Sequence, residues 1–159
     1  MVIGLACRVD NGHAHVGMVV LQRVDGDLRV LSYRLRPSAH HDLSQQLLNL
    51  GADLETRLKD VSPTAIVVAT MEKWGGGIRR PHEPSTRLRL RVEGVLLETA
   101  RRHVSEEVRV LTGQQIGAEC GSDKETVTGR ARTLVDPRDE LVDACAAALA
   151  GLAQVERAR

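Results

Sequence analysis

Aromatic side chains are almost absent from this sequence of 159 residues, which contains one Trp, one Tyr and no Phe. The core must therefore be built from Leu, Val, Ile and Ala, and the single tryptophan, Trp74, raises a functional question. Only three cysteines occur, Cys7, Cys120 and Cys145, and they form no CxxC pair. This odd, scattered set argues against disulfides and zinc and favours a reducing compartment.

The sequence also lacks a charge excess and long apolar runs. The net charge is +1, so any surface that binds nucleic acid has to be local. No apolar run approaches the roughly 18 residues of a membrane helix, and the first residues do not resemble a signal peptide. We therefore expect a cytoplasmic protein without membrane contact. Charged residues at 27% and apolar residues at 42% fit a single globular domain over residues 1–159.

The first part of the chain predicts an antiparallel meander. Apolar runs end at tight turns of the kind that join hairpin strands, Asn11-Gly12 and Asp25-Gly26. The three strands that these turns separate are Val2 to Asp10, Ala14 to Arg23 and Leu28 to Leu35. Asp10 thus stands at the end of the first strand.

The rest of the chain alternates helices and strands. From Asp42 to Leu58, leucines recur at three and four residues, which predicts an amphipathic helix. The continuous apolar run 65–71 predicts a central parallel strand. Thr86 to Val104 fits strand or helix locally, and its length favours helix. A strand over 108–111, a helix over 123–134 and a last helix with Asp136 as N-cap and Pro137 at its first position complete the order. This is an α/β domain with a mixed sheet of three antiparallel and then parallel strands, flanked by helices.

Five acidic residues are candidates for a metal site. Asp10 and Glu72 each follow an apolar run, and Asp139, Glu140 and Asp143 share the start of the last helix. Carboxylates are the ligands that Mg²⁺ prefers, and two such ions can promote phosphodiester hydrolysis. These acids could instead have structural roles and bind no metal. Asp10 is also a common turn residue, and Asp139 and Glu140 would be stabilised by the dipole at a helix N-terminus. Glu72, directly after a buried strand, fits that interpretation less well.

The ordered set of short motifs resembles the RuvC-like Holliday junction resolvases of the RNase H-like superfamily. Val9-Asp10-Asn11-Gly12 with the later Gly17, and Met71-Glu72, resemble that family's first two acidic motifs. Further matches cover nearly the whole chain, in the family's order: Leu90 to Leu97 with Gly94, Gln115-Ile116, Gly121 to Val127, and Glu140-Leu-Val-Asp143-Ala144. Three positions depart from the family pattern: Asn11 replaces Pro, Glu140 replaces Asp, and Gly117 replaces a basic residue.

The resemblance implies an RNase H-like fold and a homodimer that nicks four-way DNA junctions symmetrically. It also implies two Mg²⁺ or Mn²⁺ ions as cofactors. It implies that Asp10, Glu72, Glu140 and Asp143 are the catalytic metal ligands, with Asp139 competing with Glu140, and that Lys124 lies near the scissile phosphate. A rival alignment would put Ala6 and Ala69 at the first two acidic positions. The spacing disfavours it, because it needs an insertion before Gly17 and leaves Asp10 and Glu72 without a role.

A basic segment supplies candidate DNA contacts. Between Ile78 and Arg102, seven arginines oppose three glutamates, a local net charge of +4. Arginine binds phosphate in bidentate fashion, so Arg79, Arg80, Arg87 and Arg91 are predicted DNA ligands, although a solvated helix face explains them equally well. Trp74 could stack on an exposed base or fold back as a lid on the core. Apolar residues on several sides of the 86–104 helix, with Gly94 among them, also predict that a homodimer buries this helix.

Three functions remain open from the sequence. The first is a metal-dependent endonuclease that resolves four-way junctions. The second is a nuclease for other branched or structured nucleic acid. The third is a protein that binds junctions without cutting them.

Overall fold

The computed structural model describes residues 1–37, 42–71, 83–104 and 108–158, and the structural statements below concern these residues. The strands are β1 (Val2–Asp10), β2 (His13–Val24), β3 (Asp27–Leu35), β4 (Ala65–Thr70) and β5 (Val108–Thr112). The helices are α1 (Leu43–Lys59), α2 (Glu83–His103), α3 (Gly113–Glu119), α4 (Lys124–Leu134) and α5 (Asp139–Arg157).

The strands form one mixed sheet in the order β3-β2-β1-β4-β5. β1, β2 and β3 pair antiparallel through two-residue turns. Asn11, Gly12, Asp25 and Gly26 have positive φ at these turns, as the Asn-Gly and Asp-Gly signals predict. β4 is parallel to both β1 and β5, so the carboxyl ends of β1, β4 and β5 meet at one edge of the sheet. The predicted fold class is confirmed.

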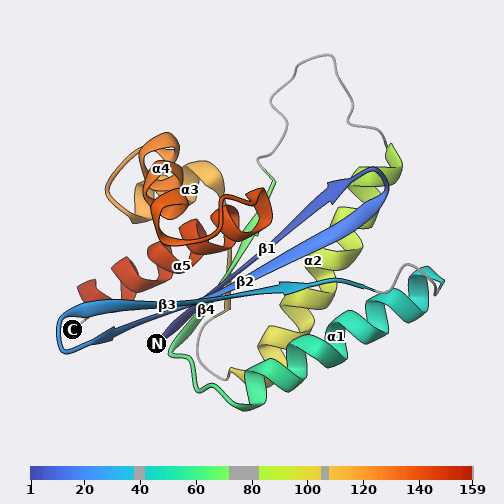
Figure 1. Ribbon diagram of the computed structural model, residues 1–159, viewed down its shortest axis with the longest axis horizontal. Coiled ribbons are helices and arrows are strands. Elements are labelled where there is room, and N and C mark those ends of the chain that lie inside the picture. Colours follow the sequence, from blue (N-terminus) through green and yellow to red (C-terminus); the bar gives the residue numbers. More distant parts are fainter. Residues whose placement is uncertain (38–41, 72–82, 105–107, 159) are drawn as a thin grey trace.

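Helices cover both faces of the sheet (Figure 1). One face packs against α1 and α2 through an aliphatic core that includes Leu5, Leu54 and Leu96. The other packs against α5, with α3 and α4 beside it, through Ala6, Val67 and the alanines of α5. Side chains alternate between these faces along β1, so Ala6, Arg8 and Asp10 belong to the α5 side. The described helices include none that is long and apolar enough to cross a membrane.

Helix α5 lies unusually close to β1. A Cβ at Gly4 would lie 1.9 Å from the carbonyl oxygen of Ala144, so only glycine fits at that position. α5 is rich in alanine, with Ala144, Ala147 and Ala148 fully buried, which lets its backbone approach the strands. Because α5 runs antiparallel to β1, its first turn lies toward the carboxyl ends of β1 and β4.

The elements agree with the sequence expectations at most places. The 86–104 segment is helical, as its length indicated, and it begins earlier, at Glu83. The predicted start of the last helix is wrong. Arg138 is the N-cap residue, and Asp136 instead accepts from the Arg138 backbone N–H through its carbonyl oxygen at 2.7 Å. Helix α3 was missed, although Thr112 and Gln115 form a capping box that the sequence contains.

Candidate functional site at the start of helix α5

The sheet surface beneath the first turn of α5 is built from small residues. Ala6 of β1 pairs with Gly17 of β2 on one side and lies beside Ala69 of β4 on the other. A Cβ at Gly17 would lie 2.2 Å from the carbonyl oxygen of Glu140. The helix therefore rests directly on β2 at Gly17, and the strand positions nearest its first turn carry no oxygen ligands.

Glu140 is bound by an arginine from the edge strand. Arg34 of β3 pairs with Gly17 across the strands, and Gly17 leaves space for the long side chain of Arg34 to reach α5. Nε and Nη2 of Arg34 each lie 2.6 Å from Oε1 of Glu140. The side chain of Glu140 is only 9% exposed. Burying a carboxylate without a partner is costly. The guanidinium of Arg34 offsets this cost for Glu140 with a charged hydrogen bond.

Asp143 is bound by a second arginine. Nε of Arg8 donates to Oδ2 of Asp143 at 2.6 Å, and both side chains are partly exposed. The hydrogen bond to Asp143 raises the pKa of the Arg8 guanidinium above its ordinary value, and the charges of Asp143, Asp139 and Glu140 add to this. Three acidic side chains at the start of α5 therefore stabilise one arginine on β1.

Asp10 lies at the tip of the β1–β2 hairpin, where it pairs with His13 and is exposed. It is four residues beyond Ala6 along β1, a distance of about 13 Å at the usual rise per residue. Four residue pairs, from Cys7–Val16 to Asp10–His13, lie between Gly17 and the turn of this hairpin. The strand register therefore places Ala6 and Ala69 near the first turn of α5, and Asp10 farther along β1. Which of the two alignments assigns the acidic positions stays a prediction.

The described residues at this site do not by themselves supply the ligands of a two-metal centre. Among the described residues, no group of three or more His, Cys, Asp or Glu side chains could hold a metal ion. Glu140 and Asp143 each use a carboxylate oxygen on an arginine. His15 of β2 pairs with Arg8 of β1. The Nδ1 atom of His15 is buried and has no hydrogen-bond partner among the described residues. Within the described part of the chain, one imidazole nitrogen and two arginine-bound carboxylates do not provide the converging oxygens that Mg²⁺ requires.

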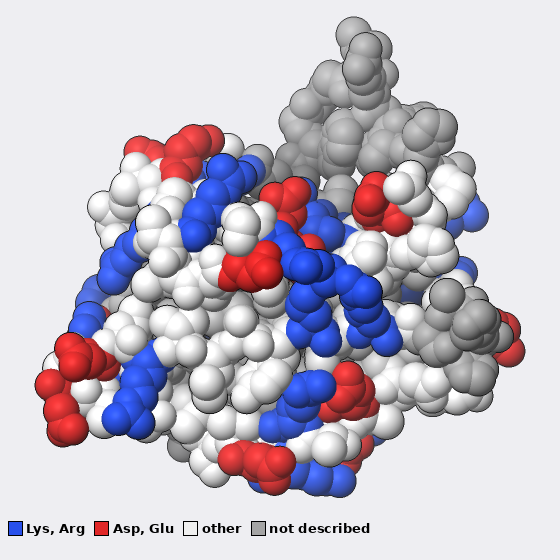
Figure 2. Space-filling view, in the orientation of Figure 1, with Lys and Arg blue, Asp and Glu red and all other residues white. Residues whose placement is uncertain are grey.

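Glu140 and Asp139, the two alternatives for one predicted metal ligand, differ in burial. Glu140 is 7% exposed and faces the sheet, whereas Asp139 is exposed. Figure 2 shows acidic and basic side chains next to one another over the start of α5 and the strands beside it. The surface here therefore carries both positive and negative charges. The assignment of Glu140 or Asp139 as a ligand stays a prediction.

Four predicted site residues lie outside the described part of the chain: Glu72, Trp74, Arg79 and Arg80. The nearest described residues are Met71, just after β4, and Glu83, the first residue of α2. Their predicted roles therefore remain predictions.

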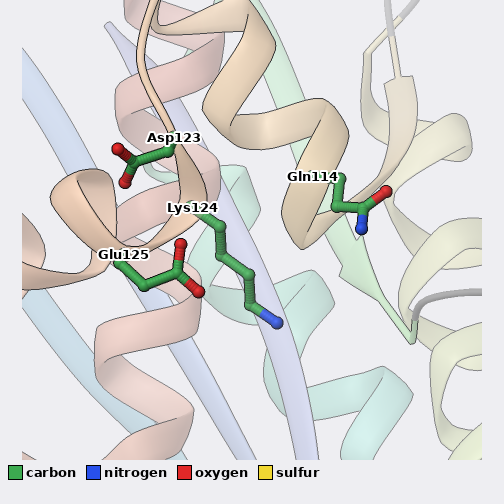
Figure 3. A pocket seen from close by; sticks show the side chains of 4 residues that line it. All are labelled: Gln114, Asp123, Lys124 and Glu125. Carbon is green, nitrogen blue, oxygen red and sulfur yellow. The ribbon is translucent and has the colours of Figure 1, made fainter.

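Lys124 lies in the first turn of α4, beside a shallow pocket of about 290 Å³. Figure 3 shows Lys124 and Glu125 extending from α4, with Gln114 of α3 across the pocket. The Asp123 carboxylate accepts from the backbone N–H of Thr126, which caps α4 and lowers the pKa of Asp123. Of the described residues, four line this pocket, and no acid of α5 is among them.

Arg87 and Arg91 are exposed on α2, on the side of the sheet opposite α5. Thr70, the last residue of β4, donates to Glu93 of α2 at 2.8 Å. The turns of α2 before Glu93 therefore lie near the carboxyl edge of the sheet, the edge at which α5 begins. Two other arginines of α2 are paired within the helix, Arg89 with Glu93 and Arg102 with Glu98.

Sequence reasoning missed Arg8 and Arg34. Their partners are 135 and 106 residues away in the chain. No local spacing contains such a signal. The strand register would have been needed to place Arg34 beside Gly17 and hence beside α5.

Comparison with solved structures identifies the fold. The chain is similar to RuvC from Thermus thermophilus, with a TM-score of 0.69 and 18% identity, over 99% of this chain and 96% of that one. It is also similar to T. thermophilus RuvC solved in complex with a Holliday junction substrate, with a TM-score of 0.68, 20% identity and 98% and 94% coverage. No protein-family model matches, and no curated protein matches at a significant level. The chain therefore has a RuvC-like fold.

Proposed function

We propose that this protein binds branched DNA, with the four-way junction as its preferred form. The observation that carries the proposal is the likeness, over nearly the whole chain, to a RuvC solved on a Holliday junction. The shared fold supports the proposal that this chain binds a ligand of the same shape. Binding of this kind needs the fold and its basic groups and does not need a complete metal site.

The basic groups that we assign to DNA lie along one edge of α2. At about 100° per residue, Arg87 and Arg91 share one edge of the exposed face, and Leu90, Gly94 and Leu97 share the neighbouring edge. Arg87 and Arg91 are exposed one turn apart, a spacing that suits successive contacts to a phosphate backbone. Trp74, Arg79 and Arg80, which precede α2, complete the proposed DNA surface.

The neighbouring edge of α2 supports the proposed homodimer. Leu90 is 58% exposed, and a Cβ at Gly94 would have no neighbour within 4 Å. Val92, Leu96 and Ala100 are already buried in the core. A second copy packed on the side of α2 that carries Leu90 would cover apolar surface. Light scattering at micromolar concentration should then give the mass of a dimer, and Leu90→Glu should give a monomer.

A binding experiment tests the main proposal. Fluorescence anisotropy with a labelled four-way junction, a three-way junction, a flap and a linear duplex of the same length should show the tightest binding for the junction. The preference should persist in EDTA. Emission of Trp74, the only tryptophan, should be quenched on addition of junction. Equal affinity for junction and linear duplex at the same salt concentration would refute the proposal.

Metal-dependent cleavage of junctions is the second candidate function. It is favoured by the position of Glu140 and Asp143 on one face of α5, near the edge of the sheet at which β1 ends with Asp10 and β4 ends with Thr70, two residues before Glu72 in the sequence. This function requires two Mg²⁺ or Mn²⁺ ions. Their proposed ligands are Asp10, Glu72 and Asp143, together with either Glu140 or Asp139. Lys124 would lie near the phosphate that is cut. Incubating labelled junction with protein and Mg²⁺ should yield paired nicks that Asp10→Asn and Glu72→Gln abolish without loss of binding. Intact junction in the wild-type reaction would exclude this candidate.

A further inference from the structure

Two of the carboxylates at the start of α5, Glu140 and Asp143, each form an ion pair with an arginine of the sheet. Glu140 and Asp143 are three residues apart on one helix face, where like charges repel. Arg34 and Arg8 reach them from different strands, β3 and β1, with the contacts at 2.6 Å. Positive charge is thus delivered to the start of α5 by the protein itself.

We infer that Arg8 and Arg34 take the place of divalent cations at the start of α5, so that this site is complete without metal. The floor of the site agrees with this inference, because Ala6, Ala69 and Gly17 contribute no oxygen ligand. A metal ion would have to displace guanidinium groups that the fold holds in place.

The chemistry of arginine makes that displacement difficult. A guanidinium stays protonated at any ordinary pH, so no proton loss can release the carboxylates. Arg34 places Nε and Nη2 on the same oxygen of Glu140, and its own side chain is only 23% exposed. Each arginine is tethered to the sheet and therefore competes with a free cation at a high effective concentration.

The inference does not depend on DNA binding, and it can be tested on the free protein. After dialysis against EDTA, thermal unfolding is measured with and without MnCl2, and Mn²⁺ binding is followed by electron paramagnetic resonance. The wild-type protein should show no saturable binding and no rise in Tm with Mn²⁺.

The Arg8→Gln/Arg34→Gln variant removes both charges and keeps polar, though shorter, side chains. Its Tm should fall by roughly 10 °C, because the buried carboxylate of Glu140 loses its partner. Mn²⁺ should restore roughly 5 °C of that loss with saturable binding. Arg8→Gln alone, at a more exposed pair, keeps the test available if the double variant does not fold, and it should gain weaker Mn²⁺ binding.

Arg23→Ala is the matched control, since Arg23 of β2 also pairs with α5, at Glu156, in a more exposed position. Its Tm should change little, and it should gain no Mn²⁺ binding. Saturable Mn²⁺ binding by the wild-type protein that Glu140→Gln or Asp143→Asn removes would overturn the inference. An arginine double variant that is folded and gains no Mn²⁺ binding would also overturn it.

Discussion

Gly17 of β2 touches the backbone of Glu140 in α5, and a Cβ at this glycine would lie 2.2 Å from the Glu140 carbonyl oxygen. Both partners are backbone at this contact, so neither can move aside as a flexible side chain could. Gly17→Ala should therefore push the first turn of α5 away from the sheet and lower the free energy of unfolding by about 2–4 kcal/mol. Urea denaturation followed by far-UV circular dichroism measures the change.

Gly129→Ala is the control for that substitution. Gly129 lies in α4, and a Cβ there would have no neighbour within 4 Å. The same chemical change should stabilise the protein by roughly 0.5–1 kcal/mol, because alanine favours helix. If Gly17→Ala were as harmless as Gly129→Ala, the register that places Gly17 under Glu140 would be wrong.

The arrangement of elements could be predicted from the sequence because its signals are local. Asn11-Gly12 and Asp25-Gly26 mark both hairpins, and the leucine spacing from Leu43 marks the buried face of α1, where Leu50, Leu54 and Leu58 are buried. The apolar run from Ala65 predicts a central strand, and β4 lies between β1 and β5. Each of these signals depends on neighbours within a few residues.

The candidate site could be predicted only in part because it depends on register. The gap from Asp10 to Gly17 equals the family's spacing, yet Gly17 pairs with Ala6 and Asp10 pairs with His13. A sequence cannot tell whether extra residues lengthen a hairpin or shift a motif. The arginine partners of Glu140 and Asp143 were invisible for the same reason, since side chains from β3 and β1 reach α5 only once the sheet is assembled.

The α2 edge should bind DNA phosphates in a way that salt weakens. Arg87→Ala/Arg91→Ala should reduce junction affinity and lower the slope of log K against log salt by about 1 for each phosphate that the variant no longer neutralises. Affinity for linear duplex should also fall, because phosphate contacts carry no sequence information and every DNA form offers phosphates. Anisotropy titrations between about 50 mM and 200 mM salt, where log K falls roughly linearly with log salt, measure both effects. Lys59→Ala, at an exposed pair with Glu55 on α1, should leave the slope unchanged.

The buried cysteines should be unreactive in the folded protein. Burial raises the pKa of Cys7 to about 12 and that of Cys145 to about 11. Cys120 is only partly buried, and burial also raises its pKa. Because the thiolate is the nucleophile, a thiol reagent at neutral pH should modify Cys120 slowly and the other two only after unfolding. Mass spectrometry after a timed alkylation, with and without urea, counts the labels. Rapid labelling of Cys7 in the native protein would contradict the packing of α1 and α2 on the sheet, and rapid labelling of Cys145 would contradict the packing of α5.

Two ion pairs on α2 have the same spacing and different burial, and they should differ in strength. Arg89 and Glu93 are 15% and 11% exposed, and Glu93 also accepts from Thr70 at the end of β4. Arg102 and Glu98 are 70% and 62% exposed. Glu93→Ala should cost about 3–5 kcal/mol, because it leaves the guanidinium of Arg89 buried without a partner, whereas Glu98→Ala should cost less than about 1 kcal/mol. Arg89→Met/Glu93→Leu should be far less destabilising than Glu93→Ala, since it removes both charges and keeps the volume. For each pair, a double-mutant cycle replaces both partners by alanine, singly and together, and is measured by urea denaturation. Equal coupling energies in the two cycles would show that burial is not what strengthens the Arg89–Glu93 pair.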